Sequence, residues 1–257
     1  MATIAAVTFD FHNTLVTGER WLHLEIHTLP CAVLEHLVGE GTLPPAAAAP
    51  AVLAQAEATY RAIREEAKAS GSEVTAQAGV VRVFATLGPL GAVDGPRLAA
   101  ALAAVQQACL ADTTLIPGAH EVLAALRQAG RHLAVVSSAA YAPFVHWALA
   151  RHGLAGYFPV VATSAETGYY KSDPRLYAWA LDQLQVAPRQ AVHVGDHARF
   201  DILGAQAAGM RAILFAPAGG PDAPGRPGDC RPDAVVADLR DIPAALAQLE
   251  QAPDRRA

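Results

Sequence analysis

The sequence has little of several features that mark whole classes of proteins. It holds only 3 Cys in 257 residues, too scattered for a disulfide framework or a structural zinc site (Cys31, Cys109 and Cys230). Lys and Arg number 19 against 24 Asp and Glu, so the formal net charge is −5. A chain with this charge balance lacks the excess of basic residues that is typical of proteins that bind nucleic acid or acidic lipid. We therefore expect neither a disulfide-stapled scaffold nor a nucleic-acid-binding protein.

Long hydrophobic runs are also lacking. No uncharged apolar run free of Pro and Gly approaches the roughly 20 residues that a membrane span needs. The N-terminus has no basic region and reaches Asp10 after a short apolar run, which is unlike a signal peptide. The mean hydropathy of +0.23 comes largely from alanine, which favours helix. These features predict a soluble, cytoplasmic protein with no membrane partner.

The composition is that of a globular protein, with 53% hydrophobic and 17% charged residues. Six short apolar runs rich in β-branched residues are bounded by Gly, Pro, Ser or Asp. Such runs are typical of strands that helices cover on both faces of a parallel sheet. They are Ile4–Phe9, Leu133–Val136, Val160–Ala162, Ala191–Val194, Ala212–Phe215 and Ala234–Val236.

Segments with helical periodicity lie between the later runs. Strand and helix in alternation predict an α/β fold with an open, doubly wound parallel sheet and right-handed crossovers. The predicted helices are His120–Gly130, Tyr141–Gly153, Pro174–Leu184 and Asp201–Gly209.

A long stretch after the first strand contains no convincing strand and is too long for one crossover. It predicts an inserted helical domain over residues 17–112, with residues 1–16 and 113–257 forming the α/β core. A stretch rich in Pro and Gly near the end, Ala216–Pro232, predicts a surface loop. The helices expected in the insertion are Arg20–Val38, Pro45–Ser70, Glu73–Leu87 and Gly95–Asp112.

Residues that carry chemistry follow the predicted strands. Asp10 follows the first, Ser137 the second, and Asp196 the fourth. Lys171 precedes a helix, and Asp201 begins the next one along the chain. Ligands of such sheets bind beyond the carboxyl ends of the strands, so we expect these side chains to converge on one edge.

This set of residues suits attack by a carboxylate on an electrophilic centre. Asp10 would be the nucleophile, and Asp196 with Asp201 would help it to hold Mg²⁺, which prefers hard oxygen ligands. Lys171 and Ser137 would bind the oxygens of a transferring phosphoryl group.

Four segments in order resemble the motifs of the haloacid dehalogenase superfamily. TFDFHNTLV is similar to the first, in which a strand precedes Asp-x-Asp-x-Thr, and VVSSA to the second. YYKSDPRLYAWAL is similar to the third, and VHVGDHARFDILGAQAAGM closely matches the fourth. The resemblance covers essentially the whole chain, and the predicted insertion lies where many members carry a helical cap.

The resemblance implies a Rossmann-like core and transfer through an aspartyl intermediate on Asp10. It implies a phosphate-binding set of Thr14, Ser137 or its neighbour Ser138, and Lys171. It also implies metal ligation by Asp10, Asp196 and Asp201, together with the backbone carbonyl of the residue at position 12. The implied cofactor is Mg²⁺, and the implied substrate is a small phosphorylated molecule.

Position 12 departs from the family pattern, because His12 stands where phosphatases have a second Asp as acid and base. In one interpretation, His12 performs that proton transfer. In a second, the chain is a metal-independent 2-haloacid dehalogenase, whose relatives also lack that Asp. In a third, it is a catalytically impaired protein that binds a ligand.

The acids of the fourth motif favour the first interpretation. Dehalogenases of the family need no metal and tend to lack this pair, whereas Asp196 and Asp201 are both present. We therefore predict a phosphatase with Asp10, His12 and Lys171 as its catalytic residues. The sequence leaves the substrate open, and it allows a monomer or a homodimer.

Overall fold

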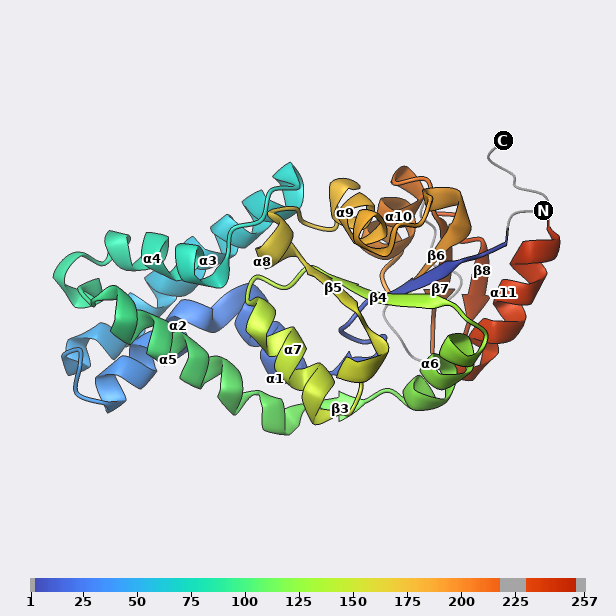
Figure 1. Cartoon of the computed structure of the whole chain (residues 1–257). Helices are drawn as coiled ribbons and strands as arrows, with labels where there is room; N and C mark the ends of the chain where they lie inside the picture. The colour runs from blue at the N-terminus through green and yellow to red at the C-terminus, as the bar shows by residue number, and fades with distance from the viewer. Residues whose placement is uncertain (1–2, 218–229, 253–257) are drawn as a thin grey trace.

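The computed structural model describes residues 3–217 and 230–252. Its centre is a six-stranded parallel sheet in the order β5-β4-β1-β6-β7-β8 (Figure 1). All six predicted strands are present, within two residues at either end. The strands are β1 (Ala6–Phe9), β4 (His132–Ser137), β5 (Val160–Thr163), β6 (Ala191–Gly195), β7 (Arg211–Phe215) and β8 (Ala234–Val236).

Strand β1 lies in the middle of the sheet and is buried along its whole length. Its last residue, Phe9, pairs with Val135 of β4 on one side and with Val194 of β6 on the other. The chain continues from β1 to one side of the sheet and later returns to the other side. This reversal of strand order opens a crevice beyond the carboxyl end of β1, directly where Asp10 follows.

Helices cover both faces of the sheet, as the alternating pattern predicted. Val7 and Phe9 pack with α6 (Ala119–Gln128), α7 (Ala142–Arg151) and α11 (Ile242–Gln251). Ala6, which points to the other face, packs with α9 (Arg175–Leu184) and α10 (Leu203–Ala207). The shorter elements of this half are α8 (Ser164–Thr167), η5 (Ala155–Tyr157), η6 (Pro188–Gln190), η7 (Ala198–Ile202) and η8 (Leu239–Asp241).

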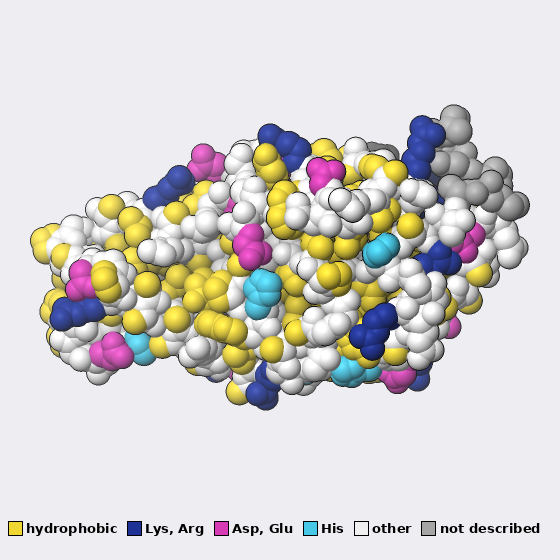
Figure 2. Space-filling view, viewed as in Figure 1, with side chains coloured by type: hydrophobic (Ala, Val, Ile, Leu, Met, Phe, Trp, Pro, Cys, Tyr) yellow, Lys and Arg dark blue, Asp and Glu magenta, His cyan; other side chains and the backbone are white. Residues whose placement is uncertain are grey.

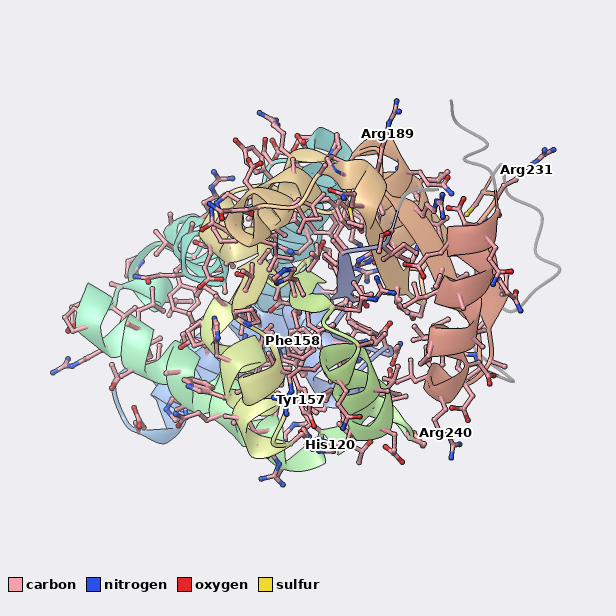
Figure 3. The ribbon with its side chains drawn as sticks, turned by 45° about the vertical axis from the view of Figure 1, so that its right-hand side comes forward. His120, Tyr157, Phe158, Arg189, Arg231 and Arg240 are labelled. Atoms are coloured by element: carbon pink, nitrogen blue, oxygen red, sulfur yellow. The ribbon has the colours of Figure 1, made fainter. Side chains whose placement is uncertain are left out.

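Aromatic contacts help to hold one of these helical layers on the sheet. The ring of Phe158 lies edge-on to that of Phe9 in β1, with 6.4 Å between centroids. Beside it, Tyr157 contacts His120 at the start of α6, as the labelled side chains in Figure 3 show. The guanidinium of Arg127 lies 4.5 Å from the centroid of the Tyr157 ring. The segment before β5 is thereby fixed against α6.

The named elements within residues 18–113 are all helices, and this segment extends to one side of the sheet (Figure 1). Two short antiparallel strands, β2 (Val16–Thr17) and β3 (Thr114–Leu115), join where this helical segment leaves the core and where it returns. The sequence did not reveal this pair, because two-residue strands carry no periodic signal. The elements are α1 (Glu19–His23), η1 (Leu24–Thr28), α2 (Leu29–Gly39), η2 (Pro45–Ala48), α3 (Pro50–Ser70), α4 (Ala76–Thr86), η3 (Gly88–Gly91), α5 (Gly95–Ala108) and η4 (Leu110–Asp112).

Two of the helices predicted in this segment are interrupted. The helix expected over Arg20–Val38 widens to a π-turn over Leu24–Thr28, because Pro30 has no N–H to donate to the carbonyl of Ile26. The helix expected from Pro45 instead begins at Pro50, which as a proline is tolerated only in a first turn.

Three other helix boundaries also differ from the prediction. Helix α4 begins only at Ala76, after Thr75 accepts a hydrogen bond from the Ala78 N–H as its N-cap. Helix α5 ends at Ala108, and a 3₁₀ turn replaces its expected last turn. Asp201 lies inside the π-turn η7 and does not cap a helix.

The surface in Figure 2 is mostly polar or neutral, and acidic and basic side chains lie scattered over it. Hydrophobic side chains gather there in the centre of the view, over α5 and α7. No helix among the described residues is long and apolar enough to span a membrane. The predicted loop over Ala216–Pro232 lies largely outside the described residues.

Candidate active site

A cavity of about 310 Å³ lies beyond the carboxyl ends of β1, β4 and β6. Thr14 is the one predicted site residue that does not line it: its side chain is fully buried, and its hydroxyl has no partner among the described residues. The other predicted residues all line this cavity: Asp10, His12, Ser137, Ser138, Lys171, Asp196 and Asp201.

Asp10 is held at the end of β1 as a continuation of the sheet. Its N–H donates to the carbonyl of Val194 at 2.8 Å, and only 7% of the residue is exposed. Burial raises the pKa of its carboxyl group, and the charge of Asp201 raises it further, whereas the ammonium of Lys171 opposes both. Asp10 is therefore a fixed, poorly hydrated carboxyl group that depends on neighbouring cations for its charge.

Lys171 lies between two carboxylates. Its ammonium donates hydrogen bonds to Asp10 and to Asp201, and the residue is 4% exposed. Burial by itself would lower the pKa of Lys171, but the two carboxylates hold it above its ordinary value. The backbone N–H of Lys171 donates to Ser138 Oγ at 3.1 Å, which joins this lysine to the loop after β4.

Asp201 is bound from several sides. Its Oδ2 accepts from the backbone N–H of His197 at 2.8 Å, and its Oδ1 lies 3.2 Å from His193 Nε2. His193 in turn contacts Thr8 Oγ1 through Nδ1 at 2.8 Å, so both of its buried ring nitrogens have partners. Burial would raise the pKa of Asp201, but Lys171 and His193 keep it well below its ordinary value.

Asp196 completes a cluster of three acids. One carboxylate oxygen each from Asp10, Asp196 and Asp201 lies within 4.8 Å of the other two. Burial, followed by the charges of the other two acids, raises the pKa of Asp196 to about 8. Three carboxyl groups so close repel one another unless a cation lies between them, and oxygen donors are those that Mg²⁺ prefers. The donor set therefore fits a divalent cation.

His12 is turned away from this cluster toward the start of the helical segment. Its Nε2 accepts a hydrogen bond from the N–H of Gly18 at 3.3 Å, and its ring lies 5.7 Å from that of Trp21. Burial lowers the pKa of His12, although the charge of Glu19 opposes the shift. The structure therefore holds this imidazole in its neutral form.

One face of α1 and η1 supplies the wall opposite the sheet. Trp21, Leu22, Glu25 and Ile26 line the cavity from positions one turn apart, with the Trp21 ring stacked on that of Phe144 at 4.5 Å. No motif of the sequence indicated these four residues. Arg64 and Lys68 of α3 line the cavity too, and only their i, i+4 spacing could have indicated a shared face.

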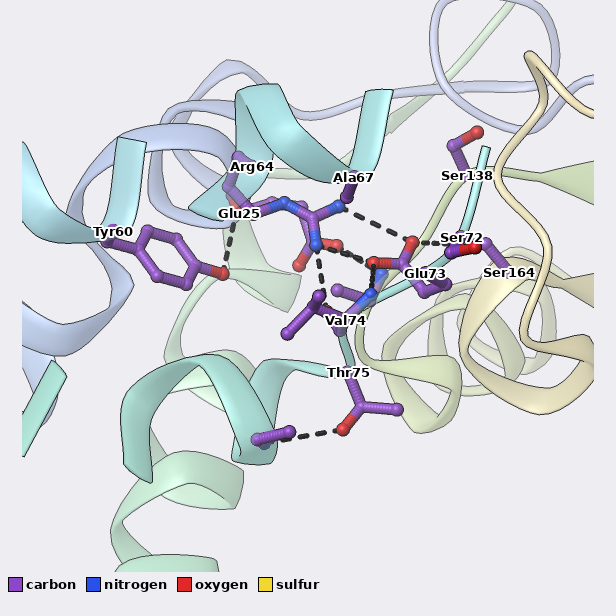
Figure 4. A network of polar contacts seen from close by, with 12 residues as sticks. Glu25, Tyr60, Arg64, Ala67, Ser72, Glu73, Val74, Thr75, Ser138 and Ser164 are labelled. Atoms are coloured by element: carbon purple, nitrogen blue, oxygen red, sulfur yellow. Dashed lines mark hydrogen bonds and ion pairs between the residues drawn. The ribbon is translucent and has the colours of Figure 1, made fainter. Parts of the chain in front are cut away.

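A buried polar network supports this wall (Figure 4). Arg64 donates to Glu73 at 2.6 Å, and Glu73 accepts from Ser164 Oγ of the core at 2.5 Å. Glu25 accepts from the backbone N–H of Ala140, in the loop that also carries Ser138. Burial raises the pKa of Glu25 to about 7, despite the nearby charge of Arg64. The two glutamates thus tie the helical segment to the loop after β4 and to the start of α8.

Comparison with known proteins decides the family. The family described as haloacid dehalogenase-like hydrolase matches residues 4–209, most of the chain. The chain belongs to this family. The resemblance seen in the four motifs is therefore confirmed, and so is the predicted fold class, because the six-stranded parallel sheet is that of the family's solved members.

Several haloacid dehalogenase-like proteins resemble the chain individually. A phosphoserine phosphatase of Thermus thermophilus is 37% identical over 128 residues, which are 50% of this chain and 49% of that protein. The solved 2-haloacid dehalogenase of Pseudomonas syringae pv. Tomato is 26% identical with a TM-score of 0.71, covering 96% of this chain and 100% of that one.

A phosphatase of the same family from Thermococcus onnurineus shares the fold, with a TM-score of 0.62 and 21% identity over 94% of this chain and 97% of that one. The chain spans about half the length of the curated relatives it matches. These relatives include both phosphatases and a dehalogenase, so the family alone leaves the reaction undecided.

Proposed function

We propose that this chain hydrolyses a small phosphate monoester in a Mg²⁺-dependent reaction through an aspartyl-phosphate on Asp10. The observation that carries the proposal is the meeting of three carboxylates and one buried lysine at a single cavity. Such a set offers a nucleophile, a site for a cation and a fixed positive charge, which are the elements that phosphoryl transfer needs. Several relatives are themselves phosphatases.

Asp10, Asp196 and Asp201 would hold Mg²⁺ together with the backbone carbonyl of His12. When bound, the ion supplies positive charge to the oxygens of the phosphoryl group. Asp201 has a second task in this arrangement, because it also accepts from Lys171 and His197. It therefore orients the lysine as well as contributing charge to the metal site.

In the first step, a carboxylate oxygen of Asp10 attacks phosphorus and the bond from phosphorus to the ester oxygen breaks. Lys171 Nζ and Ser137 Oγ bind the phosphoryl oxygens and stabilise the charge that they carry. The leaving oxygen takes its proton from water, because the Nε2 of His12 is an acceptor in its bond with Gly18.

In the second step, water attacks the phosphorus of the aspartyl-phosphate and frees the Asp10 carboxylate and phosphate. The attacking water must lose a proton, and a neutral imidazole can take it on Nε2 once the bond to Gly18 is released. His12 thus serves the second step better than the first. We expect slow turnover of esters with poor leaving groups.

We further propose that residues 17–112 act as a cap over a core formed by residues 1–16 and 113–257. The helical segment supplies one wall of the cavity, and the small β2–β3 pair lies where it meets the core. A cavity of about 310 Å³ with the helical segment as one wall suits a small soluble substrate better than a phosphorylated protein.

The test is phosphate release from a panel of small phosphomonoesters, with Mg²⁺ and with EDTA. Wild-type protein should release phosphate only with the metal, and Asp10→Asn should abolish release. Circular dichroism and thermal unfolding of Asp10→Asn serve as the control for folding. Release that persists in Asp10→Asn or in EDTA would contradict the proposed mechanism.

A second candidate is hydrolysis of a 2-haloacid, favoured by the similarity to the Pseudomonas syringae dehalogenase. In this reaction Asp10 would attack carbon and expel halide without a metal. Halide release from 2-chloropropionate in EDTA would support it over the phosphatase. Absence of both activities, with tight binding of a phosphorylated ligand, would indicate an impaired member that only binds.

A further inference from the structure

The cationic side chains of the cavity differ in how firmly they are held. Among the described residues, Arg64, Lys68 and Lys171 line it. Lys171 is held by Asp10 and Asp201, and Arg64 is held by Glu73, whose side chain is fully buried (Figure 4). Arg64 is matched by a buried carboxylate, and Lys171 is already assigned to the phosphoryl group, so neither cation is available to a second anionic group.

Lys68 is different, because its partner is at the surface. Its ammonium lies 2.7 Å from Glu65, whose side chain is 68% exposed, and the side chain of Lys68 itself is 23% exposed. Ion pairs of exposed groups on a helix are weak, and water replaces them readily. Lys68 can therefore leave Glu65 for an anion in the cavity at little cost.

The backbone of Lys68 is fixed beside the phosphoryl site. Its carbonyl accepts a hydrogen bond from Ser172 Oγ at 2.8 Å, and Ser172 directly follows Lys171. The neighbouring carbonyl of Ala67 accepts from the N–H of Gly71 at 3.0 Å. These bonds satisfy carbonyls at the end of α3 that would otherwise repel an anion. Lys68 and Lys171 thus line the same cavity from neighbouring positions.

Part of the lining near these two cations is apolar. Leu22 and Ile26 lie one turn apart on the same face and are only partly buried, and Phe200 lines the cavity from the core. Glu25, the acid of this wall, accepts from Ala140 N–H and is 2% exposed. A ligand between the cations would therefore meet hydrocarbon along its middle.

Resting on the phosphatase function proposed above, we propose that Lys68 binds a second anionic group of the substrate, a carboxylate, and that the substrate is a short phosphorylated carboxylic acid. The phosphoryl end lies at Asp10 and Lys171, the carbon skeleton at Leu22 and Ile26, and the carboxylate at Lys68. Lys68 is in this assignment a specificity-determining residue and takes no part in the transfer.

The single positive charge of Lys68 favours a carboxylate over the other groups that could lie beside it. One ammonium balances the single charge of a carboxylate, whereas a second phosphoryl group carries about two negative charges and would be left uncompensated. An amino group would be repelled by Lys68. A hydroxyl group could accept a hydrogen bond from the Lys68 ammonium, but it carries no negative charge and so lacks the attraction between two opposite charges that a carboxylate has.

The test measures binding of two matched phosphonates that cannot be hydrolysed, in the presence of Mg²⁺. 3-Phosphonopropionate ends in a carboxylate, and 3-hydroxypropylphosphonate ends in a hydroxyl at the corresponding position. Isothermal titration calorimetry of wild-type protein should show the carboxylate ligand binding about tenfold more tightly, as expected for one hydrogen bond between charged groups. The difference in affinity between the two ligands should decrease as the salt concentration rises.

Lys68→Gln should remove this preference, because glutamine has no charge, and Lys68→Arg should retain most of it. Arg61→Gln is the matched control, because Arg61 is an exposed cation of the same helix that does not line the cavity. Equal affinity of wild-type protein for both ligands, or a preference that survives Lys68→Gln, would overturn the assignment.

Turnover separates this proposal from the one on which it rests. Wild-type protein should hydrolyse phosphoglycolate with a KM about tenfold below that for 2-hydroxyethyl phosphate, at similar kcat. Hydrolysis of both esters at the same KM would leave the phosphatase function standing and remove the role of Lys68. If neither ester is hydrolysed, the proposed phosphatase function is contradicted. The calorimetric result would still decide what Lys68 binds.

Discussion

The Nε2 atom of His12 accepts a hydrogen bond of 3.3 Å from the backbone N–H of Gly18. A ring nitrogen that accepts carries no proton, so the imidazole is neutral with its hydrogen on Nδ1. Gly18 directly precedes α1, the first helix that lines the cavity. The residue that replaces the family's second Asp is therefore engaged with the junction to the helical segment.

This bond leads to a prediction for His12→Asp. A carboxyl group at this position can donate a proton to the leaving oxygen and then accept one from water, and general acid–base catalysis of this kind contributes about 10²-fold or more. We expect kcat for alkyl phosphates to rise by at least about tenfold. Turnover of p-nitrophenyl phosphate, whose leaving group needs no proton, should change little.

His12→Asn is the matched control, since it has nearly the same shape as the Asp variant but cannot act as an acid. Steady-state kinetics on both esters with all three proteins checks the prediction. A lower rate for His12→Asp than for wild-type protein on alkyl phosphates would show that the imidazole itself performs the proton transfer.

Gly195→Ala should weaken the metal site without removing any charge. A methyl group at Gly195 would overlap the carboxyl group of Asp201, so Asp201 would have to leave its bonds to Lys171 and His197. Because Asp201 is itself assigned as a ligand, its displacement should weaken Mg²⁺ binding by at least the roughly 10–100-fold that loss of a supporting group typically costs. Titration calorimetry with Mg²⁺ measures this directly. Gly39→Ala, where no atom lies within 4 Å of the added carbon, should bind Mg²⁺ as wild-type protein does.

Glu25→Gln should change how stability depends on pH. The pKa of Glu25 is raised by burial from an ordinary value of 4.5 to about 7. Between these values the folded protein binds more protons than the unfolded chain, so this group makes the free energy of unfolding fall as pH rises. The fall is at most about 3 kcal/mol, at about 1.4 kcal/mol for each pKa unit.

Urea unfolding of wild-type protein and Glu25→Gln at pH 5 and pH 7 checks this prediction. The free energy of unfolding of Glu25→Gln should rise relative to that of wild-type protein as the pH increases, because glutamine cannot ionise. Glu66→Gln, at an exposed position of α3, should have the same free energy of unfolding as wild-type protein at both pH values. A difference between Glu25→Gln and wild-type protein that is the same at pH 5 and pH 7 would contradict the assignment.

Lys171→Met should destabilise the protein strongly at neutral pH. It removes the ammonium that contacts both Asp10 and Asp201, and leaves two buried carboxylates facing each other. Breaking a buried ion pair in this way costs about 3–5 kcal/mol. Chemical denaturation without metal measures the loss, with the exposed Arg82→Met as control. A loss below about 1 kcal/mol would mean that the charges are not paired as the structure has them.

Much of the fold follows from local sequence. Each run that became a strand of the main sheet is short, apolar and bounded by turn residues, and a strand buried on both faces needs little else to be recognised. The helix ends of the insertion were predicted less well. Pro30 and Pro50 interrupt helices that periodicity alone would continue, and Thr75 caps a helix that begins later than the predicted Glu73.

The sequence by itself determined where the reactive groups lie. Asp10, Ser137 and Asp196 each stand at or just past the end of a parallel strand, and the carboxyl ends of such strands meet at one edge of the sheet. Only the tertiary structure decided what surrounds them. The wall with Glu25 and Lys68 and the site of Lys171 between two carboxylates depend on helix packing. Contacts between residues far apart in the chain leave no periodic trace in the sequence.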